Sequence, residues 1–320
     1  MNVLVTGATG FIGSALVSIL SGKEGFESFA AVRSQQSGLP ATIQTIQVGD
    51  LNADTNWELA LKNIQVVVHA AARVHVMKDA KTDPLGEYRK TNVAGTLNLA
   101  RQAIESGVKR FIFISSIKVN GEATEQGNPY TASDEPQPKD PYGISKLEAE
   151  QGLFELARGS SMGVVIIRPP LVYGPGVKAN FHSMMRWLDR GIPLPLGAIR
   201  NKRSLVALDN LVDLIVTCID HPAAANQVFL AGDGEDLSTT ELLERLSMAL
   251  GRPARLIPIP ARIIEIGAAL LGKGDIAQRI CGSLQIDISR TGDLLDWQPP
   301  VTVDEALHKT AESFISSKQK

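Results

Sequence analysis

A tyrosine and a lysine four residues apart, Tyr142 and Lys146, are the side chains in this sequence best placed for acid–base chemistry. A spacing of four puts the phenol and the ammonium on one face of a helix, one turn apart. Tyrosine is a poor base near neutrality, because its ordinary pKa is about 10. A lysine charge beside it lowers that pKa. We therefore expect Tyr142 to act as a general acid or base at a reacting oxygen.

A serine is expected to orient the substrate for this pair. Ser116 lies in FIFISSIKVNG, where a strand is predicted to end, 26 residues before Tyr142. Its hydroxyl would hold a substrate oxygen toward the phenol, and Ser115 is the fallback for the same role. A tyrosine and a lysine at this spacing usually form a plain surface pair, so the interpretation depends on what else the sequence holds.

A glycine-rich turn near the N-terminus supplies the second part. TGATGFIG, residues 6–13, directly follows a predicted strand at Asn2–Thr6 and opens a predicted helix at Ile12–Ser21. In such a turn the first glycine permits the tight bend, the second lets the backbone approach a pyrophosphate, and the third lets the helix pack on the strand. Free amides at the helix start then face the phosphates. The residues expected to meet a dinucleotide here are Gly7, Gly10, Phe11, Ile12 and Gly13.

The end of the second predicted strand indicates which dinucleotide is bound. A carboxylate about 20 residues after the glycines would grip the ribose hydroxyls of NAD. This sequence has Arg33 and Ser34 there instead. A guanidinium offers paired donors to the oxygens of a 2′-phosphate. NADP(H) is therefore favoured, while NAD(H) stays open because Arg33 stacked on adenine would suit either cofactor.

Two further segments are expected to contact the cofactor. Asp50, in VGDL, follows the third predicted strand, where its carboxylate would accept from the adenine amino group. Three alanines follow His69 at the end of the fourth strand and leave room for the adenosine and pyrophosphate. The residues predicted to line this part of the site are Asp50, Leu51, Ala70, Ala71 and Ala72.

The elements that must position these residues alternate between short β-branched runs and helical patterns. Such alternation predicts an α/β fold of the Rossmann type, a doubly wound parallel sheet with helices on both faces. Nearly continuous apolar runs at Val66–Val68 and Phe111–Ile114 fit strands buried on both sides. The remaining expected strands are Phe29–Arg33, Ile43–Val48 and Val164–Arg168, and the remaining expected helices are Gly86–Ser106 and Tyr142–Arg158.

Composition changes near Arg168, and the predicted division follows it. Residues 1–170 are expected to form the NAD(P)-binding domain, and residues 171–320 a smaller substrate-binding region, with elements near 204–231 returning to the core. The region is expected to contain strands at Ser204–Ala207 and Gln227–Ala231, and helices that begin at Asp209, after the capping box at Ser238 and near Val303. The apolar segment Ile263–Leu271 is expected to be buried in the core rather than to lie on a membrane.

The net charge, the cysteines and the apolar runs of the sequence exclude several classes of protein. A net charge of −2 over 320 residues gives no field for nucleic acid. Cys218 and Cys281 lie far apart without metal-ligand spacing, so no metal is expected. The N-terminus does not resemble a signal peptide, and no apolar run is long enough for a transmembrane span. We expect a cytoplasmic protein without membrane insertion.

The motifs together resemble the extended short-chain dehydrogenases/reductases, in particular the NAD-dependent epimerase/dehydratase group. The resemblance runs from TGATGFIG through VGDL, HAAA, KTNVAGTLNL, SSIKVNG and YGISK to RPPLVYGPG. It implies a nucleotide-linked sugar of the UDP type as substrate, held between the core and the C-terminal region, and it is compatible with a homodimer of paired helices. It adds these residues to the cofactor contacts: Asn92, Ser115, Tyr142, Lys146 and Pro169.

Departures from the family pattern narrow the expected reaction. Ile117 and Lys118 stand where sugar 4,6-dehydratases have an aspartate and a glutamate, which argues against dehydration. Asn120 stands where 4-epimerases usually have a tyrosine. With Arg33 these differences favour reduction of a 4-keto-sugar nucleotide for polysaccharide biosynthesis. A UDP-glucose or UDP-N-acetylglucosamine 4-epimerase is the alternative, because HAAARVHV, RPPLVYGPG and KRSLVALDNL also resemble that subgroup.

Two further readings stay open, a reductase of a hydrophobic ketone such as a steroid or flavonoid, and a cofactor-binding regulator without turnover. The regulator would be indicated by loss of Tyr142 or Lys146, and both are present. The residues expected to bind substrate are Ser116, Asn180, Leu196, Arg203 and Arg279.

Overall fold

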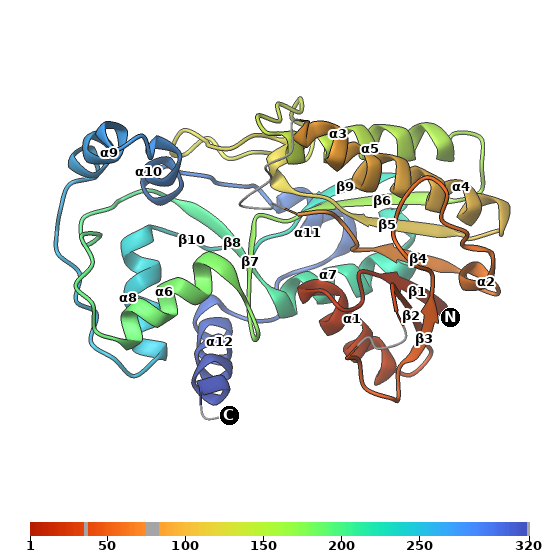
Figure 1. The fold of residues 1–320 in the computed structure, drawn as a ribbon, viewed down its shortest axis with the longest axis horizontal. Helices are drawn as coiled ribbons and strands as arrows, with labels where there is room; N and C mark the ends of the chain where they lie inside the picture. The colour runs from red at the N-terminus through yellow and green to blue at the C-terminus, as the bar shows by residue number, and fades with distance from the viewer. Residues whose placement is uncertain (35–37, 75–82, 319–320) are drawn as a thin grey trace.

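A seven-stranded parallel sheet forms the centre of the molecule (Figure 1). The computed structural model describes residues 1–34, 38–74 and 83–318. The strand order is β3-β2-β1-β4-β5-β6-β9, and every neighbouring pair is parallel. The predicted doubly wound α/β fold is confirmed. The strands are β1 (Asn2–Thr6), β2 (Glu27–Val32), β3 (Gln44–Gln47), β4 (Val66–His69), β5 (Arg110–Ile114), β6 (Gly163–Arg168) and β9 (Gln227–Leu230).

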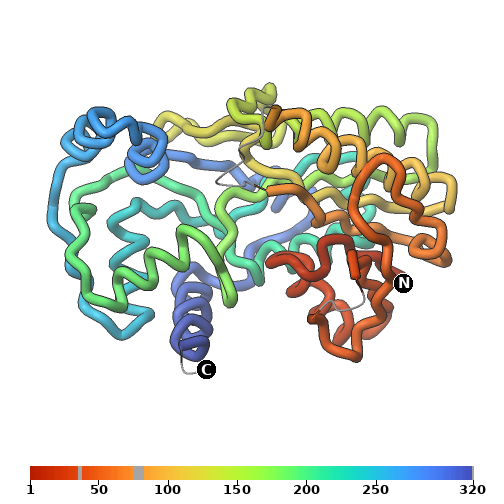
Figure 2. Tube along the Cα trace, in the orientation of Figure 1, coloured from red at the N-terminus to blue at the C-terminus, as the bar shows by residue number. Residues whose placement is uncertain are grey.

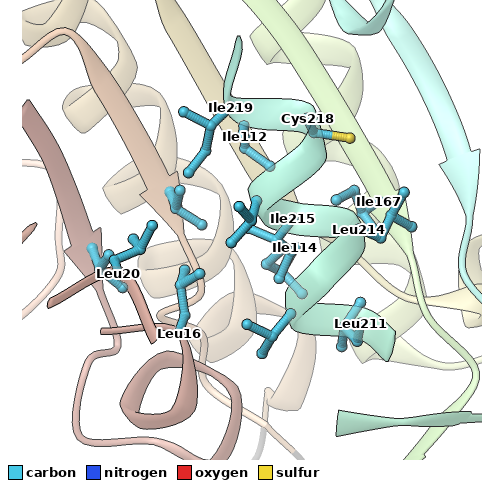
Figure 3. Packing of buried hydrophobic residues seen from close by; sticks show 14 of the residues in the cluster. Leu16, Leu20, Ile112, Ile114, Ile167, Leu211, Leu214, Ile215, Cys218 and Ile219 are labelled. Atoms are coloured by element: carbon cyan, nitrogen blue, oxygen red, sulfur yellow. The ribbon is translucent and has the colours of Figure 1, made fainter. Parts of the chain in front are cut away.

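Helices bury both faces of this sheet, as the apolar strand runs require. Alternate residues of β1 divide between two apolar clusters, Val3 and Val5 on one face and Leu4 on the other. The first face carries α1 (Phe11–Ser21), α7 (Leu208–Asp220) and α11 (Ser289–Leu295). Figure 3 shows Leu211, Leu214 and Ile215 of α7 packed against Ile112 and Ile114 of β5. The second face carries α2 (Glu58–Leu61), α3 (Pro84–Tyr88), α4 (Thr96–Glu105) and α5 (Pro141–Ala157).

The helix predicted at Gly86–Ser106 is interrupted. Between α3 and α4 the chain forms a π-helical segment, η1 (Arg89–Gly95). Gly95 lies against the loop after β3, where a Cβ would come 2.7 Å from Cγ of Leu51. The π-helical segment also contains Asn92, whose side chain is buried. Such π-helical segments often mark functional positions. This one lies between α3 and α4 and contacts the loop that follows the end of β3.

The C-terminal region builds a smaller sheet in the order β10-β8-β7, with an apolar cluster of its own. The predicted capping box at Ser238 is confirmed. Of the elements between 204 and 231, β8 belongs to the small sheet and β9 is a strand of the large sheet. Helix α7 packs on a face of the large sheet. The elements of the region are β7 (Leu171–Tyr173), α6 (Ala179–Asp189), β8 (Arg203–Ala207), η3 (Pro222–Ala224), β10 (Asp236–Leu237), α8 (Thr239–Ala249) and α12 (Val303–Lys318).

A pair of helices, α9 (Ala261–Leu270) and α10 (Gly274–Cys281), lies at the opposite end of the molecule from the N-terminus (Figure 2). The expected burial of Ile263–Leu271 is wrong, because no residue of α9 is buried and Leu270 is 83% exposed. Apolar composition predicted burial, but of the described elements α10 packs beside α9 and leaves Ile263, Ile266 and Leu270 exposed. Within the described ranges, no helix is long and apolar enough to cross a membrane.

Candidate active site

The glycine turn between β1 and α1 is built so that side chains do not fit. Gly7 has a φ of +66°, and a Cβ on it would lie 2.7 Å from the backbone of Ala70 and Ala71. A Cβ on Gly13 would lie 2.2 Å from the carbonyl oxygen of Gly7. The amide of Gly10 donates to that same oxygen at 2.8 Å and closes the turn. The backbone of the turn is therefore open to a ligand that approaches closely.

The start of α1 offers this ligand unsatisfied donors. Its N-cap, Gly10, provides no side-chain hydrogen bond, and no acidic residue stands in the first turn. Phe11 and Ile12 are only partly buried. Uncapped amides at a helix start bind anionic groups, and the positive end of the helix dipole adds to this. The turn and the helix start together fit the pyrophosphate of a dinucleotide.

Replacing Gly13 by alanine tests this fit. The new Cβ would meet backbone atoms, so the turn or α1 must shift. Overpacking of this kind costs about 1–3 kcal/mol, and we expect the Kd for the dinucleotide to rise by about tenfold or more. Calorimetric titration measures it. Gly22→Ala, at the other end of α1 with 3.8 Å to the nearest atom, is the control. Equal affinity in both variants would contradict the assignment.

The other predicted cofactor residues follow the ends of β2, β3 and β4. Arg33 and Asp50 are exposed, whereas Leu51 and the alanines at 70–72 are partly buried. The amide of Ala71 donates to Oγ1 of Thr6 at 3.3 Å, which ties the end of β4 to β1. The last residues of HAAARVHV, 75 and 76, lie outside the described residues.

His69 is held inside the core by two threonines. Its Nδ1 lies 2.6 Å from Oγ1 of Thr6, and its Nε2 lies 2.9 Å from Oγ1 of Thr96. Burial, with a smaller contribution from the Lys146 charge, lowers the pKa of His69 to about 3. The imidazole is therefore neutral and structural.

The lowered pKa of His69 predicts a pH dependence of stability. Between about pH 3 and its ordinary pKa near 6.5, the unfolded chain binds a proton that the folded protein does not. The free energy of unfolding should therefore fall as the pH drops through this window, by about 1.4 kcal/mol per pH unit. Urea denaturation of the wild type and of His69→Gln, which lacks this titration, measures the difference in slope. His308→Gln, at an exposed site, is the control, and a slope unchanged in His69→Gln would contradict the prediction.

Tyr142 and Lys146 stand in the first turns of α5, whose start is fixed by Asp140. Oδ1 of Asp140 accepts from the amide of Gly143 at 2.7 Å, and Pro141 occupies the first position of the helix. Lys146 is buried, donates to the carbonyl oxygen of Ile114 at 2.8 Å, and its Nζ lies 4.1 Å from the centre of the Phe113 ring. The lysine is thus directed to the end of β5.

The pKa values of this pair are displaced in opposite directions. Burial lowers the pKa of Lys146 to about 7, although the Glu150 carboxylate partly offsets the effect. Burial also raises the pKa of Tyr142, and Asp140 and Tyr88 add to this. The lowering of the tyrosine pKa expected from Lys146 does not arise from the protein's own groups, because desolvation of the phenolate outweighs it. These groups favour the protonated phenol.

The two serines after β5 have separate partners. Ser115 is buried, and its hydroxyl donates to the Glu150 carboxylate in a short hydrogen bond, so it is occupied inside the core. Ser116 is partly exposed, and its Oγ accepts from the amide of Lys118 at the start of the short helix η2 (Ile117–Val119). Ser116 is thus the hydroxyl available to a substrate.

A buried ion pair between α5 and β6 was not predicted. Nη2 of Arg168 donates to Oε2 of Glu150 at 2.5 Å, and its Nε donates to Oε1 at 3.0 Å. Nη1 of Arg168 also donates to Oδ1 of Asn120 at 3.0 Å. Glu150 follows Lys146 by four residues on the same helical face, and that spacing was the signal available in the sequence.

Asn92 and Pro169 help to join the elements around this pair. Nδ2 of Asn92 donates to Oγ of Ser145 at 3.0 Å, and that hydroxyl donates to the carbonyl of Tyr142 at 2.8 Å. The carbonyl of Pro169 accepts from the amide of Ile117 at 3.0 Å. The first set of bonds attaches η1 to the start of α5, and the second attaches the end of β6 to η2.

The four residues predicted only for substrate binding lie apart from this set, in the C-terminal region. Asn180 begins α6 and is exposed, and Arg279 is exposed on α10. The carbonyl of Leu196 accepts from the hydroxyl of Thr240. Arg203 donates to the carbonyl of Gly282 at 3.0 Å, and burial lowers its pKa. No contact among these four unites them into one site. The described residues contain no group of three or more side chains that would hold a metal.

Several known proteins are similar to this chain over nearly its whole length. A relative in Vibrio cholerae, a UDP-glucose 4-epimerase, is 54% identical over 99% of this chain and 96% of its own length. The solved UDP-glucose 4-epimerase of Thermotoga maritima with UDP-glucose is 25% identical, with a TM-score of 0.78 over 99% of this chain and 100% of the other. MoeE5 in complex with UDP-glucose and NAD is 27% identical, with the same TM-score and coverage.

A family model, that of the NAD dependent epimerase/dehydratase family, matches most of the chain. It matches residues 3–232, which contain the glycine turn, Ser116, Tyr142 and Lys146. The match therefore spans the large sheet, including β9, and the first part of the C-terminal region. The chain belongs to the NAD dependent epimerase/dehydratase family.

Proposed function

We propose that the protein is a 4-epimerase of a UDP-hexose, with UDP-glucose as the first candidate and NAD as the cofactor. The observation that carries this proposal is the arrangement of α5 and β5. Tyr142 and buried Lys146 stand in the first turns of α5, and Lys146 donates to the carbonyl oxygen of Ile114, two residues before the partly exposed Ser116. The relative that is 54% identical over nearly the whole chain supports the same reaction.

Each residue of this set has one task in the proposed reaction. Ser116 holds the oxygen at C4 of the sugar toward Tyr142. Tyr142 takes the proton from that oxygen as the C4–H bond breaks, and returns it when hydrogen comes back to the other face. Lys146, one helical turn from Tyr142, carries the positive charge of the set. Together with the charge of a bound oxidised nicotinamide it would favour the phenolate, against the desolvation that favours the phenol in the protein alone. A bound nicotinamide supplies the acceptor and then the donor of the hydride.

The expected reduction of a 4-keto-sugar has less support than epimerisation. Asn120 was counted against an epimerase because a tyrosine is usual there. In the structure Asn120 is buried, accepts from Arg168 and donates to the carbonyl of Thr131, so it serves the core. Dehydration stays disfavoured, because Ile117 is buried and Lys118 pairs with Asp140.

NAD replaces the expected NADP. Arg33 is exposed after β2, where it is free to cover an adenine ring of either cofactor. MoeE5, which is 27% identical, was solved with NAD, and the NADP preference gains no support from the relatives. Neither the hydrophobic-ketone reading nor the regulator reading gains support from the relative at 54% identity.

One assay separates epimerase from reductase. UDP-glucose and a catalytic amount of NAD should yield UDP-galactose, detected by chromatography, with no net change in absorbance at the reduced nicotinamide band. Oxidation of NADPH or NADH by a UDP-4-keto-sugar, without interconversion of the C4 epimers, would favour the reductase. Calorimetric titration with NAD and NADP decides the cofactor.

Two expectations about the protein in the cell stay proposals. The outer faces of α4 and α5 would pair two copies in a homodimer, and the protein would work in the cytoplasm. Size-exclusion chromatography with light scattering measures the first, and fractionation of the producing cell measures the second.

A further inference from the structure

The pair of helices α9 and α10 carries an apolar surface that the proposed function does not use. In α9, Ile263, Ile266 and Leu270 follow one another at spacings of three and four and therefore share one helical face. Their exposed fractions are 59%, 62% and 83%. Leu271 and Ile276, in the turn and in α10, continue this surface and are exposed as well. An exposed apolar patch of this kind marks an interaction site.

Basic side chains surround the apolar surface. The loop at 194–197 and the segment before α9 are joined by hydrogen bonds from Leu194 to Arg255 and from Gly197 to Ile257. Six exposed basic residues lie on α9, α10, the segment before α9 and the chain from 194 to 200, against two acidic residues, Glu265 and Asp275. One of the six, Arg252, pairs with Asp189, which leaves five. In the part of the chain that the structure describes, none of the five forms an ion pair. They are Arg200, Arg255, Arg262, Lys273 and Arg279.

The charge of this surface distinguishes between a second copy of the chain and a lipid surface as its binding partner. The chain as a whole has a net charge of −2, so a local excess of three positive charges is a distinct feature. Two copies meeting here face to face would bring the same basic residues against one another, which is unfavourable. Anionic headgroups over acyl chains complement both parts, because short amphipathic helices with basic residues lie in that interface.

We propose that α9 and α10 dock the protein on the surface of an anionic phospholipid bilayer. Ile263, Ile266 and Leu270 enter the boundary between headgroups and acyl chains, and the basic residues meet the lipid phosphates. The helices lie on the surface and do not cross it, in accord with the short length of α9. The segment after α10 bonds to β8. The carbonyl of Gly282 accepts from Arg203, and the carbonyl of Leu284 accepts from the amide of Ser204, so the docked side adjoins the small sheet.

Vesicle flotation with the full chain tests the proposal. The wild type should float with vesicles of phosphatidylcholine and phosphatidylglycerol, and much less with phosphatidylcholine alone or in high salt. Ile266→Ser/Leu270→Ser and Arg262→Gln/Lys273→Gln should each lower the lipid partition coefficient roughly tenfold or more. The matched control is Leu59→Ser/Lys62→Gln on α2, since Leu59 is 82% exposed but lies in the N-terminal part.

Three results would overturn it. The first is a wild-type protein that does not float with anionic vesicles. The second is a control variant that loses binding as strongly as the variants of α9 and α10. The third is a change from dimer to monomer in sedimentation velocity for Ile266→Ser/Leu270→Ser without any vesicle binding by the wild type, which would make this surface a contact between copies. Interconversion of UDP-sugars in solution is measured separately and should stay unchanged in all these variants, so failure of the proposed function and failure of docking are distinguishable.

Discussion

Replacement of Tyr142 by phenylalanine is expected to lower kcat for interconversion of UDP-glucose and UDP-galactose by about 10²–10⁴-fold. The change removes one hydroxyl and keeps the ring, which packs edge-on to Tyr88 with 6.0 Å between the ring centres. Without the phenol, no group in this set takes or returns the proton at the sugar oxygen, since Lys146 is bonded to the carbonyl of Ile114. Steady-state kinetics at saturating UDP-glucose measures the effect.

The matched control for this change is Tyr88→Phe. Tyr88 is buried against Tyr142 but has no task in the proposed reaction, so kcat should change little. The Kd for NAD and the thermal midpoint of both variants should stay near those of the wild type. Full activity of Tyr142→Phe, or an equal loss in both variants, would show that the proton passes through another group.

Replacement of Glu150 by alanine is expected to have the largest effect on stability. The substitution leaves the Arg168 guanidinium buried without its carboxylate, and also removes the acceptor of the Ser115 hydroxyl. Loss of one partner of a buried pair costs about 3–5 kcal/mol. Urea denaturation followed by circular dichroism measures the free energy of unfolding. If Glu150→Ala does not fold, Glu150→Gln keeps the shape and removes only the charge.

The same helix offers the control. Glu148, two residues earlier, pairs with Arg89 in a partly exposed ion pair, and exposed pairs contribute little. Glu148→Ala should therefore leave the denaturation midpoint nearly unchanged. The double variant Glu150→Met/Arg168→Met removes both charges and should be more stable than Glu150→Ala. An equal loss from Glu148→Ala and Glu150→Ala would mean that burial of the pair has no special weight.

The parts of the site that the sequence predicted are local in the chain. Gly7, Gly10 and Gly13 are three residues apart, and the close contacts that exclude side chains there are mostly set by the turn itself. Tyr142 and Lys146 follow from the period of one helix. In each case neighbouring residues fix the geometry, so their types and spacing were sufficient.

Features that join distant segments were not predictable in the same way. The ion pair between Glu150 and Arg168 depends on how α5 lies over β6, and the role of Asn120 follows from that pair. Whether the face of α9 is covered depends on elements far along the chain, and apolar composition alone suggested burial. Arg33 has two interpretations for one exposed position, because what its side chain would meet in a bound cofactor is not fixed by its neighbours in the chain.

The return of α7 and β9 to the large sheet limits how the chain can be recombined. These elements follow the small-sheet strand β8, yet Leu211 and Ile215 of α7 belong to the same apolar cluster as Ile114 of β5, the strand that Ser116 follows. Leu295 of α11 and Trp297, two residues after it, join that cluster. The C-terminal region, residues 171–320, is therefore no exchangeable module. A chimera designed to transfer sugar specificity from a relative would have to graft β7 to β8 and the segments around α8 to α10, and retain the native α7, β9 and α11 as part of the recipient scaffold.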